Sequence, residues 1–458
     1  MDILAGDRVA GAESLRTRAV SALLAGGDSR TRVDAATGTN KYLCPPRPDA
    51  ALACFSSCTA SPISVAGFER VTLAFEDIVD AASPRGRAAR LSRQRRDLAA
   101  RLLRYFMATG LAEAILCPSG TDALLTAALL IAAERPGRPI TAILPCSAET
   151  GTGVPLAVGG RRFDGPHAGT ALTDGVFFRV EIPLRDAAGA PRPESELNEA
   201  YAAAVAAAEG RPVVCLTHGS KTGLVAPSIP PAGADVIVDA CQGRIAPAAV
   251  AAYLGRGWPV VVTGSKFFGG PAFCGAVLFP VARRDRRGHW TVPHTGNACT
   301  DPPIASGLDP VALGTALRWT AAMTVMDAFA PRAEAMAPLL REAAAAVARG
   351  LAELPHVTQV SGQPPRGVSW ADLPSIFTFA VHDTARAPRK LTMDELRPLY
   401  HRLARQGVLL GQPVDLGGFG GLRIALGARD LVEDRDEARF GTLFAALGAA
   451  LALPRADW

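Results

Sequence analysis

Lysine is almost missing from this chain of 458 residues, which carries four lysines against 44 arginines. The four are Lys41, Lys221, Lys266 and Lys390. Arginine keeps its proton in proteins, whereas lysine can lose it when it is desolvated. A position that keeps lysine in such a chain is therefore a candidate for chemistry that needs a neutral amine, such as attack on a carbonyl.

Other features are missing too. The nine cysteines include no CxxC pair, which argues against a zinc site or a disulfide framework and predicts free thiols in a reducing compartment. The start Met1–Leu4 lacks the basic and apolar blocks of a signal peptide, and no apolar run reaches the roughly 18 residues of a membrane span. The net charge of +5 is too small to indicate a nucleic-acid partner. We expect a cytoplasmic protein without a metal site.

The remaining pattern is that of a globular enzyme with short strands alternating with helices. Hydrophobic residues make up 49% and charged residues 20% of the chain. Predicted strands are Ile140–Leu144, Val213–Leu216, Val236–Val238, Val260–Val262 and Gly275–Leu278, with helices at Ala123–Ala133 and Leu197–Ala208 between them. This alternation predicts a mostly parallel sheet between helices, whose site lies at the carboxyl ends of the strands.

The length favours two domains. We expect an irregular N-terminal arm over residues 1–75, a large α/β domain over 76–305 and a smaller α+β domain over 306–458. In the last of these the long helical patterns Pro310–Ala328 and Ala333–Leu354 precede strand-like runs such as Ile376–Val381 and Leu422–Ala425.

Two chemically distinctive residues follow two predicted strands. Asp239 ends the run Val236–Val238, and Lys266 comes shortly after Val260–Val262. A lysine that forms a Schiff base and an acid that keeps a pyridine nitrogen protonated are what pyridoxal phosphate requires. The alternatives are a strand-end Asp that caps the next turn and a solvated loop lysine. Ser265 is a candidate phosphate ligand.

The segment Ser119–Thr121 opens the helix predicted at Ala123–Ala133. Ser119 can cap this helix with Asp122 as its partner, and Gly120 lets the backbone approach an anion. A plain helix cap is the alternative to a phosphate site, but the presence of Asp239 and Lys266 favours the phosphate site.

Arg423 lies inside the apolar run Leu422–Ala425, where a lone charge needs a partner. A guanidinium suits the α-carboxylate of an amino acid. The alternative is a structural ion pair.

Together these residues resemble the class V aminotransferase family of fold-type I pyridoxal-phosphate enzymes, which includes cysteine desulfurases and kynureninase. The resemblance covers roughly residues 75–458. It implies that Asp239 pairs with the ring nitrogen, Gln242 meets the phenolic oxygen, Lys266 carries the cofactor and Arg423 binds carboxylate. It also implies a homodimer with sites near the subunit interface.

The chain departs from the family pattern where a His commonly covers the ring. The matching stretch has no His, and Glu149 or Thr150 is left as the candidate for that position. Lys221 stands where the family has Asn, so it could contact phosphate or substrate or be a plain loop cation. His218 nearby is a further cofactor-binding candidate.

The cysteine of one desulfurase subgroup is also missing, because Val414 stands in its place. Cys299 lies too early to replace it. Gly411 and Gln412 are expected to line the substrate pocket instead. Asn40, with Lys41 and Ser56 of the N-terminal arm, could reach the same site.

We therefore expect a pyridoxal-phosphate enzyme that acts on a small amino-acid-like amine, through external aldimine and quinonoid, as an aminotransferase. Elimination or replacement by a lyase is the alternative, since both share the proton removal at Cα. A non-catalytic cofactor-binding protein is more remote. A dinucleotide-binding oxidoreductase is disfavoured, because the glycine-rich Gly417–Gly421 precedes a strand instead of following one.

Overall fold

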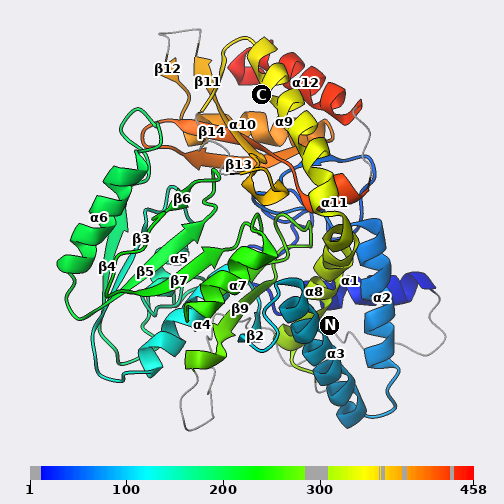
Figure 1. The fold of residues 1–458 in the computed structure, drawn as a ribbon. Coiled ribbons are helices and arrows are strands. Elements are labelled where there is room, and N and C mark those ends of the chain that lie inside the picture. The colour runs from blue at the N-terminus through cyan, green and yellow to red at the C-terminus, as the bar shows by residue number, and fades with distance from the viewer. Residues whose placement is uncertain (1–11, 284–307, 361, 363–366, 384–388, 434–437) are drawn as a thin grey trace.

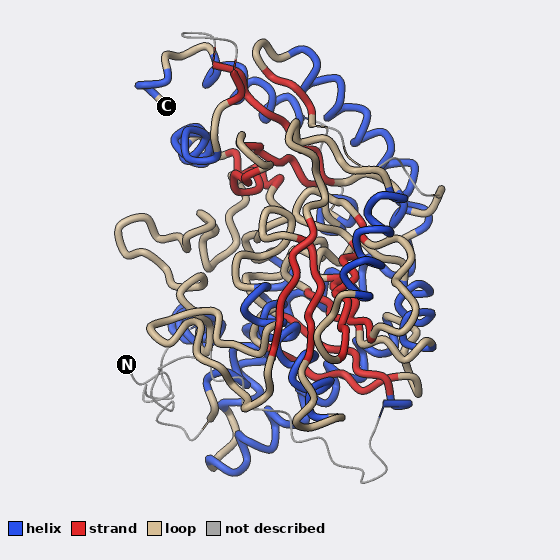
Figure 2. Tube along the Cα trace, turned by 90° about the vertical axis from the view of Figure 1, so that its left-hand side faces the viewer, coloured by secondary structure: helices blue, strands red, loops and turns tan. Residues whose placement is uncertain are grey.

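The structure is a computed structural model that describes residues 12–283, 308–360, 362, 367–383, 389–433 and 438–458. Two sheets organise it, a large one and a smaller one beside its upper edge in Figure 1. In Figure 2 the strands form a central band with helices on both sides.

The large sheet has eight strands in the order β2-β9-β8-β7-β5-β3-β4, with β6 paired to β5. Their bounds are β2 (Ala112–Cys117), β3 (Ile140–Pro145), β4 (Phe177–Ile182), β5 (Arg211–His218), β6 (Val225–Ala226), β7 (Asp235–Ala240), β8 (Val260–Thr263) and β9 (Gly275–Pro280). Strands β4, β3, β5, β7 and β8 are mutually parallel, and β9 is antiparallel to both β8 and β2. Strand β2 therefore runs in the same direction as β8, and the carboxyl ends of six strands lie along one edge.

Continuous apolar runs make these strands because both faces of the sheet are covered. Along β7, Val236 and Val238 belong to one core cluster and Ile237 to another, as the alternation of side chains requires. The covering helices are α4 (Gly120–Ala133), α5 (Val154–Val158), α6 (Glu194–Ala206) and α7 (Pro247–Gly255). Helix α4 is apolar on nearly all sides and is accordingly buried over almost its whole length.

A helical layer covers the other end of the sheet. It consists of α1 (Ala12–Leu24), α2 (Val65–Val79), α3 (Pro84–Tyr105) and α8 (Pro310–Phe329), with α8 packed against the other three. Two buried side chains join α8 to the sheet region. Trp319 donates a hydrogen bond to the Gly275 carbonyl at 2.9 Å, and Arg318 donates to the carbonyls of Phe273 and Leu23.

The smaller sheet has the strand order β1-β13-β14-β11-β10, with β12 paired to β11. Its strands are β1 (Ala53–Phe55), β10 (Val357–Gln359), β11 (Ile376–Asp383), β12 (Arg389–Lys390), β13 (Val408–Asp415) and β14 (Gly420–Ala425). Helices α9 (Ala337–Glu353), α10 (Met393–Arg405), α11 (Ala428–Val432) and α12 (Ala438–Leu451) accompany it. A large, mainly parallel sheet between helices together with a smaller α+β unit confirms the predicted fold class.

The N-terminal segment differs from the expectation of an irregular arm. Residues 1–75 include α1, β1 and most of α2. Strand β1 pairs in parallel with β13 and so belongs to the smaller sheet, although the two strands are far apart in sequence. A three-residue strand has too little periodicity to be read locally and forms because the edge of β13 offers it hydrogen-bond partners. The division at residues 75 and 305 stays a prediction.

Candidate active site

A cavity of about 600 Å³ lies between the carboxyl edge of the large sheet and strands β13 and β14 of the smaller sheet. Its walls include segments that follow β2, β3, β5, β7 and β8. Nine of the residues predicted for the site line it, namely Ser119, Gly120, Thr121, Lys221, Asp239, Ser265, Lys266, Gln412 and Arg423. Ser119, Lys221, Asp239 and Lys266 share one cavity because parallel strands end at the same edge, and Gln412 and Arg423 join them from the smaller sheet.

Asp239 and Lys266 belong to neighbouring strands. Asp239 lies in β7 opposite Val261 of β8, and Lys266 follows the end of β8 by three residues. The Asp239 carboxylate accepts a hydrogen bond from the backbone N–H of Cys241 at 3.0 Å. Within the described residues neither Asp239 nor Lys266 forms an ion pair, although both face the cavity. An acid and an amine held apart in one cavity are suited to two ends of a bound ligand.

The start of α4 forms the end of the cavity next to Ser119. The Ser119 hydroxyl caps the helix by accepting from the backbone N–H of Asp122 at 3.2 Å, and it donates to the Asp122 carboxylate at 2.6 Å. A side chain at Gly120 would begin 2.7 Å from both Cys241 Sγ and Thr263 Cγ2, so only glycine fits this close approach. The segment can therefore cap the helix and bind an anion at the same time.

Ser265 supplies an observation that points to a ligand. Its side chain is fully buried, at 0% exposure, it borders the cavity, and its hydroxyl has no hydrogen-bond partner among the described residues. A buried hydroxyl without a partner is costly, and an acceptor bound in the cavity would satisfy it.

Arg30 joins this end of the cavity from the N-terminal segment, and the sequence carried no signal for it among so many arginines. Its guanidinium lies 4.6 Å from the centre of the Phe273 ring and 3.5 Å from the Thr121 hydroxyl. Asp28 pairs with it. A planar, aromatic-stacked guanidinium beside a helix start suits a phosphate.

Glu149 and Thr150 do not line the cavity, and Ser147 and Ala148 of the same loop do. The Glu149 carboxylate instead forms a buried ion pair with Arg185 at 2.6 Å. It also accepts hydrogen bonds from Ser220 at 2.5 Å and Thr222 at 2.8 Å. Glu149 therefore organises a turn behind the cavity, and its assignment to the ring face stays untested.

Three other predicted residues, Gln242, His218 and Asn40, do not line the cavity and form hydrogen bonds with protein groups. The Gln242 amide donates to the Cys58 carbonyl at 3.2 Å and accepts from Arg244 at 3.0 Å. His218 Nδ1 lies 3.2 Å from the Tyr253 hydroxyl. Asn40 accepts from the backbone N–H groups of Tyr42 and Cys44, while its neighbours Lys41 and Tyr42 reach the cavity.

Arg423 and Lys221 meet at the end formed by the smaller sheet. Arg423, 3% exposed on β14, donates to the Lys221 carbonyl at 3.0 Å and to the Thr59 hydroxyl at 2.8 Å. The Lys221 ammonium donates to the Ser147 carbonyl at 2.8 Å. The pairing of β13 with β14 is irregular between Gly411 and Val414, which lets Gln412, Pro413 and Val414 line the cavity in succession.

No family model and no curated protein matches this chain. Solved structures do match it. A cysteine desulfurase from Escherichia coli is 18% identical, with a TM-score of 0.53 over 88% of this chain and 95% of the other. A cysteine desulfurase from Thermococcus onnurineus is 12% identical, with a TM-score of 0.55 over 87% and 94%. A cystine C–S lyase is 15% identical, with a TM-score of 0.53 over 87% and 98%.

The chain has the fold of these enzymes. The resemblance to fold-type I enzymes is thus confirmed at the level of the fold.

The thiols of the cavity differ from those of the desulfurase subgroup considered above. Val414 lines the cavity, and so do Cys58 and Cys241. Burial raises the pKa of Cys241 well above its ordinary value, which keeps this thiol protonated. Cys299 lies outside the described residues.

Two kinds of feature are absent from the part of the chain that the structure describes. No helix there is long and apolar enough to cross a membrane. No group of three or more His, Cys, Asp or Glu side chains there could hold a metal ion.

Proposed function

We propose that this chain is a pyridoxal-phosphate enzyme that transfers the amino group of an amino-acid-like substrate. The observation that carries the proposal is the arrangement of Lys266 and Asp239 in one cavity at the ends of adjacent strands. The unsatisfied hydroxyl of Ser265 in the same cavity supports it, because that hydroxyl lacks the acceptor that a phosphate would provide.

The residues present fit this cofactor. Ser119–Thr121 at the start of α4, Ser265 and Arg30 would hold the phosphate. Asp239 would face the ring nitrogen and Lys266 the aldehyde carbon. When bound, the cofactor supplies an electron sink for the charge that develops at the substrate Cα.

The side chains of the chain would perform the remaining steps. Arg423 orients the substrate by binding its α-carboxylate. Lys266 Nζ, as a free amine, removes the proton from the substrate Cα and returns it during transfer. Strands β13 and β14 close the cavity on one side and so limit the access of water to the reacting atoms.

Three further proposals concern the oligomeric state, the compartment and the partners of the chain. We expect a homodimer, as in the family that the sequence resembles. We expect action in a reducing compartment such as the cytoplasm, because all eight described cysteines are free. We expect a small amine substrate and neither nucleic acid nor membrane as a partner.

Because the chain has only four lysines, the lysine that binds the cofactor can be identified directly. The purified chain is incubated with pyridoxal phosphate, reduced with borohydride and digested, and the modified lysine is located by mass spectrometry. We expect modification of Lys266 and its loss in Lys266→Ala, with Lys390→Ala as the matched control that keeps it. Modification of another lysine, or none, would overturn the assignment.

A second assay tests the reaction. The holoenzyme is given a panel of amino acids with a 2-oxo acid acceptor, and the fate of the nitrogen is followed. Transfer to the acceptor is expected. Release of ammonia without transfer would instead indicate elimination.

A further inference from the structure

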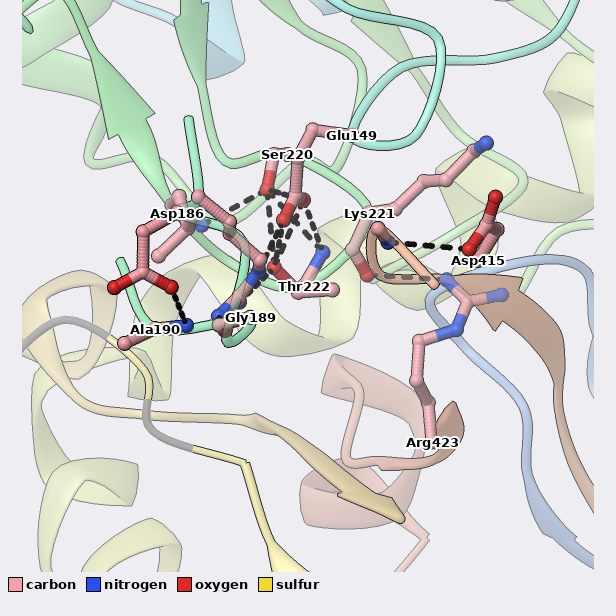
Figure 3. A network of polar contacts seen from close by, with 12 residues as sticks. Glu149, Asp186, Gly189, Ala190, Ser220, Lys221, Thr222, Asp415 and Arg423 are labelled. Carbon is pink, nitrogen blue, oxygen red and sulfur yellow. Dashed lines mark hydrogen bonds and ion pairs between the residues drawn. The ribbon is translucent and has the colours of Figure 1, made fainter. Parts of the chain in front are cut away.

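One end of the cavity holds two cations, and the acid that lines the cavity beside them, Asp415, accepts hydrogen bonds from the backbone N–H groups of Gly417 and Gly418 instead of pairing with either cation (Figure 3). Lys221 and Arg423 both line the cavity, and neither forms an ion pair within the described residues. Their hydrogen-bond partners among the described residues are neutral. Lys221 donates to the Ser147 carbonyl, and Arg423 donates to the carbonyls of Lys221 and Gln412 and to the Thr59 hydroxyl. Arg423 is buried and Lys221 is half-buried, and a positive charge withdrawn from water without an opposite charge is costly unless a ligand supplies one.

The hydrogen-bond capacity of the two side chains decides how many anions they can hold. Arg423 has five N–H donors, and four hydrogen bonds to protein are already formed. About one N–H therefore remains for a ligand. Lys221 has three N–H donors, one of which is used on Ser147. A single α-carboxylate on Arg423 would leave the free donors and the charge of Lys221 unmatched.

Hydrogen bonds on both sides of Lys221 fix the position of its backbone (Figure 3). The buried carboxylate of Glu149 binds the hydroxyls of Ser220 and Thr222 on either side of Lys221. The backbone N–H of Lys221 donates to the Glu149 carbonyl at 2.8 Å, and its carbonyl accepts from Arg423. A lysine held this firmly through its backbone is a fixed feature of the cavity and not a loosely solvated loop cation.

The electrostatics agree with an anion site. Burial, and after it the charge of Arg423, lowers the pKa of Lys221 to about 8, and Lys266 acts in the same direction. Glu149 and Cys146 act the other way, and the Glu149 carboxylate is already paired with Arg185. A bound anion would offset both the burial and the repulsion between the two cations.

These cations are separate from those next to the start of α4. Arg30 lies by the Thr121 hydroxyl at the start of α4 and is paired with Asp28. Lys221 and Arg423 are instead joined to each other through the Lys221 carbonyl, on the side of the smaller sheet. The cavity thus has one cationic end for the phosphate proposed above and a second cationic end that the cofactor does not explain.

We propose that the substrate is an amino acid with a second anionic group, whose α-carboxylate binds Arg423 and whose side-chain anion binds Lys221. This inference rests on the proposed function, and it names the substrate class. The shared chemistry is a carboxylate, phosphate or sulfonate on the substrate side chain.

The binding test uses probes that lack an amine and so cannot react. The holoenzyme is titrated calorimetrically with succinate and with butyrate, which have the same number of carbons and differ by one carboxylate. We expect succinate to bind roughly tenfold to a hundredfold more tightly, as one charge-assisted hydrogen bond provides. Lys221→Met should remove this preference and leave butyrate binding unchanged, whereas the control Lys390→Met should retain the preference.

Equal binding of the two probes by the wild-type holoenzyme would overturn the inference, and so would an equal loss of both in Lys221→Met, since a single carboxylate would then bridge both cations. If Lys221→Met does not fold, the wild-type protein decides by itself. Its affinity for succinate, and not for butyrate, should fall as the pH rises through about 8, where Lys221 loses its charge. A parallel pH dependence for both probes would contradict the proposal.

The source of the anion is then resolved with reactive pairs on the same holoenzyme. L-Aspartate, O-phospho-L-serine and L-cysteate are each compared with their neutral counterparts L-asparagine and L-serine. The charged member of at least one pair should be preferred by a similar factor, and no preference in any pair would count against an anionic substrate. Borohydride fixation at Lys266 is measured in parallel. Fixation without anion preference removes only this inference, whereas absent fixation removes the proposed function.

Discussion

Two side chains at the edge of the large sheet bury polar groups, and this burial is unfavourable in the protein without a ligand. Ser265 buries a hydroxyl without a partner among the described residues. Asp122, in the first turn of α4, buries a carboxyl group directly behind Ser119, which lines the cavity. Such costs at one cavity are typical of a site built for a ligand.

Replacement of Ser265 by alanine should separate stability from binding. Without cofactor, Ser265→Ala is expected to be at least as stable as the wild type, because it removes an unsatisfied buried hydroxyl worth about 1 kcal/mol. With cofactor, its affinity should fall roughly tenfold, since a hydrogen bond to phosphate is lost. Thermal unfolding with and without pyridoxal phosphate, plus a binding titration, measures both.

Ser119→Ala is the contrasting variant. Ser119 caps α4, so its loss should destabilise the cofactor-free protein by about 1 kcal/mol. If Ser265→Ala destabilised the cofactor-free protein as much as Ser119→Ala, the hydroxyl of Ser265 would have a structural role, and the prediction would fail.

Asp122 makes stability depend on pH. Burial raises its pKa from 3.8 to about 6, although the hydrogen bond from Ser119 opposes the shift. Between these two pH values the unfolded chain has lost the proton that the folded chain keeps, so the free energy of unfolding falls as pH rises. The contribution is on the order of 3 kcal/mol, and it is fully present only below about pH 4.

Asp122→Asn should remove this contribution and keep the acceptor for Ser119. We therefore expect the wild type to lose stability relative to Asp122→Asn between about pH 4 and pH 6. Urea unfolding at several pH values measures the difference. Two parallel curves would show that Asp122 does not titrate in this window.

At the scale of elements, the turn between β5 and β6 is shaped from outside its own sequence. Glu149, from the loop after β3, binds Ser220 and Thr222 of the turn and pairs with Arg185. Arg185 also donates to the Thr222 hydroxyl at 2.7 Å. The loops that follow three neighbouring strands, β3, β4 and β5, are thus joined through one carboxylate.

Glu149→Gln should destabilise the protein by about 3–5 kcal/mol, because it leaves the buried Arg185 without its counter-charge. The matched control is Asp97→Asn, which removes a partner of Arg101 on the exposed surface of α3 and should cost less than about 1 kcal/mol. Urea unfolding compares the two. Similar small losses would mean that the Glu149 network does not act as a buried ion pair.

At the scale of the whole molecule, Arg244 connects three regions of the chain. Its guanidinium donates at 2.8 Å to the hydroxyl of Ser57, the hydroxyl of Ser375 and the carbonyl of Leu426, and it holds the Gln242 amide at 3.0 Å. Burial lowers the pKa of Arg244 to about 10. The N-terminal segment, the large sheet and the smaller sheet thus share one buried cation beside the cavity.

Arg244→Met should weaken the coupling between the two sheets. We expect the free energy of unfolding to fall by roughly 1.5–3 kcal/mol. The thermal transition should become broader than that of the wild type or separate into two transitions. Differential scanning calorimetry measures both effects. A variant that unfolds in one sharp transition at the wild-type temperature would show that Arg244 does not connect the two sheets energetically.

The sequence predicted those features that depend on neighbouring residues. Buried parallel strands are continuous apolar runs, so β3, β5, β7 and β8 could be read directly, together with Asp239 and Lys266 at their ends. The start of α4 was readable because a capping residue and a glycine precede an apolar helix. Strands β2, β4 and β13 were not predicted, since their exposed or irregular faces blur the apolar pattern.

The amino-acid sequence by itself determined which reactive side chains stand at strand ends, because strands and caps are set over a few residues. Only the tertiary structure decided which distant groups meet: Arg30 at the start of α4, Lys221 beside Arg423, and Glu149 behind the cavity instead of in it. The physical reason is that a buried charge takes its partner from whichever segment the packing brings near, and separation along the chain carries no information about that choice.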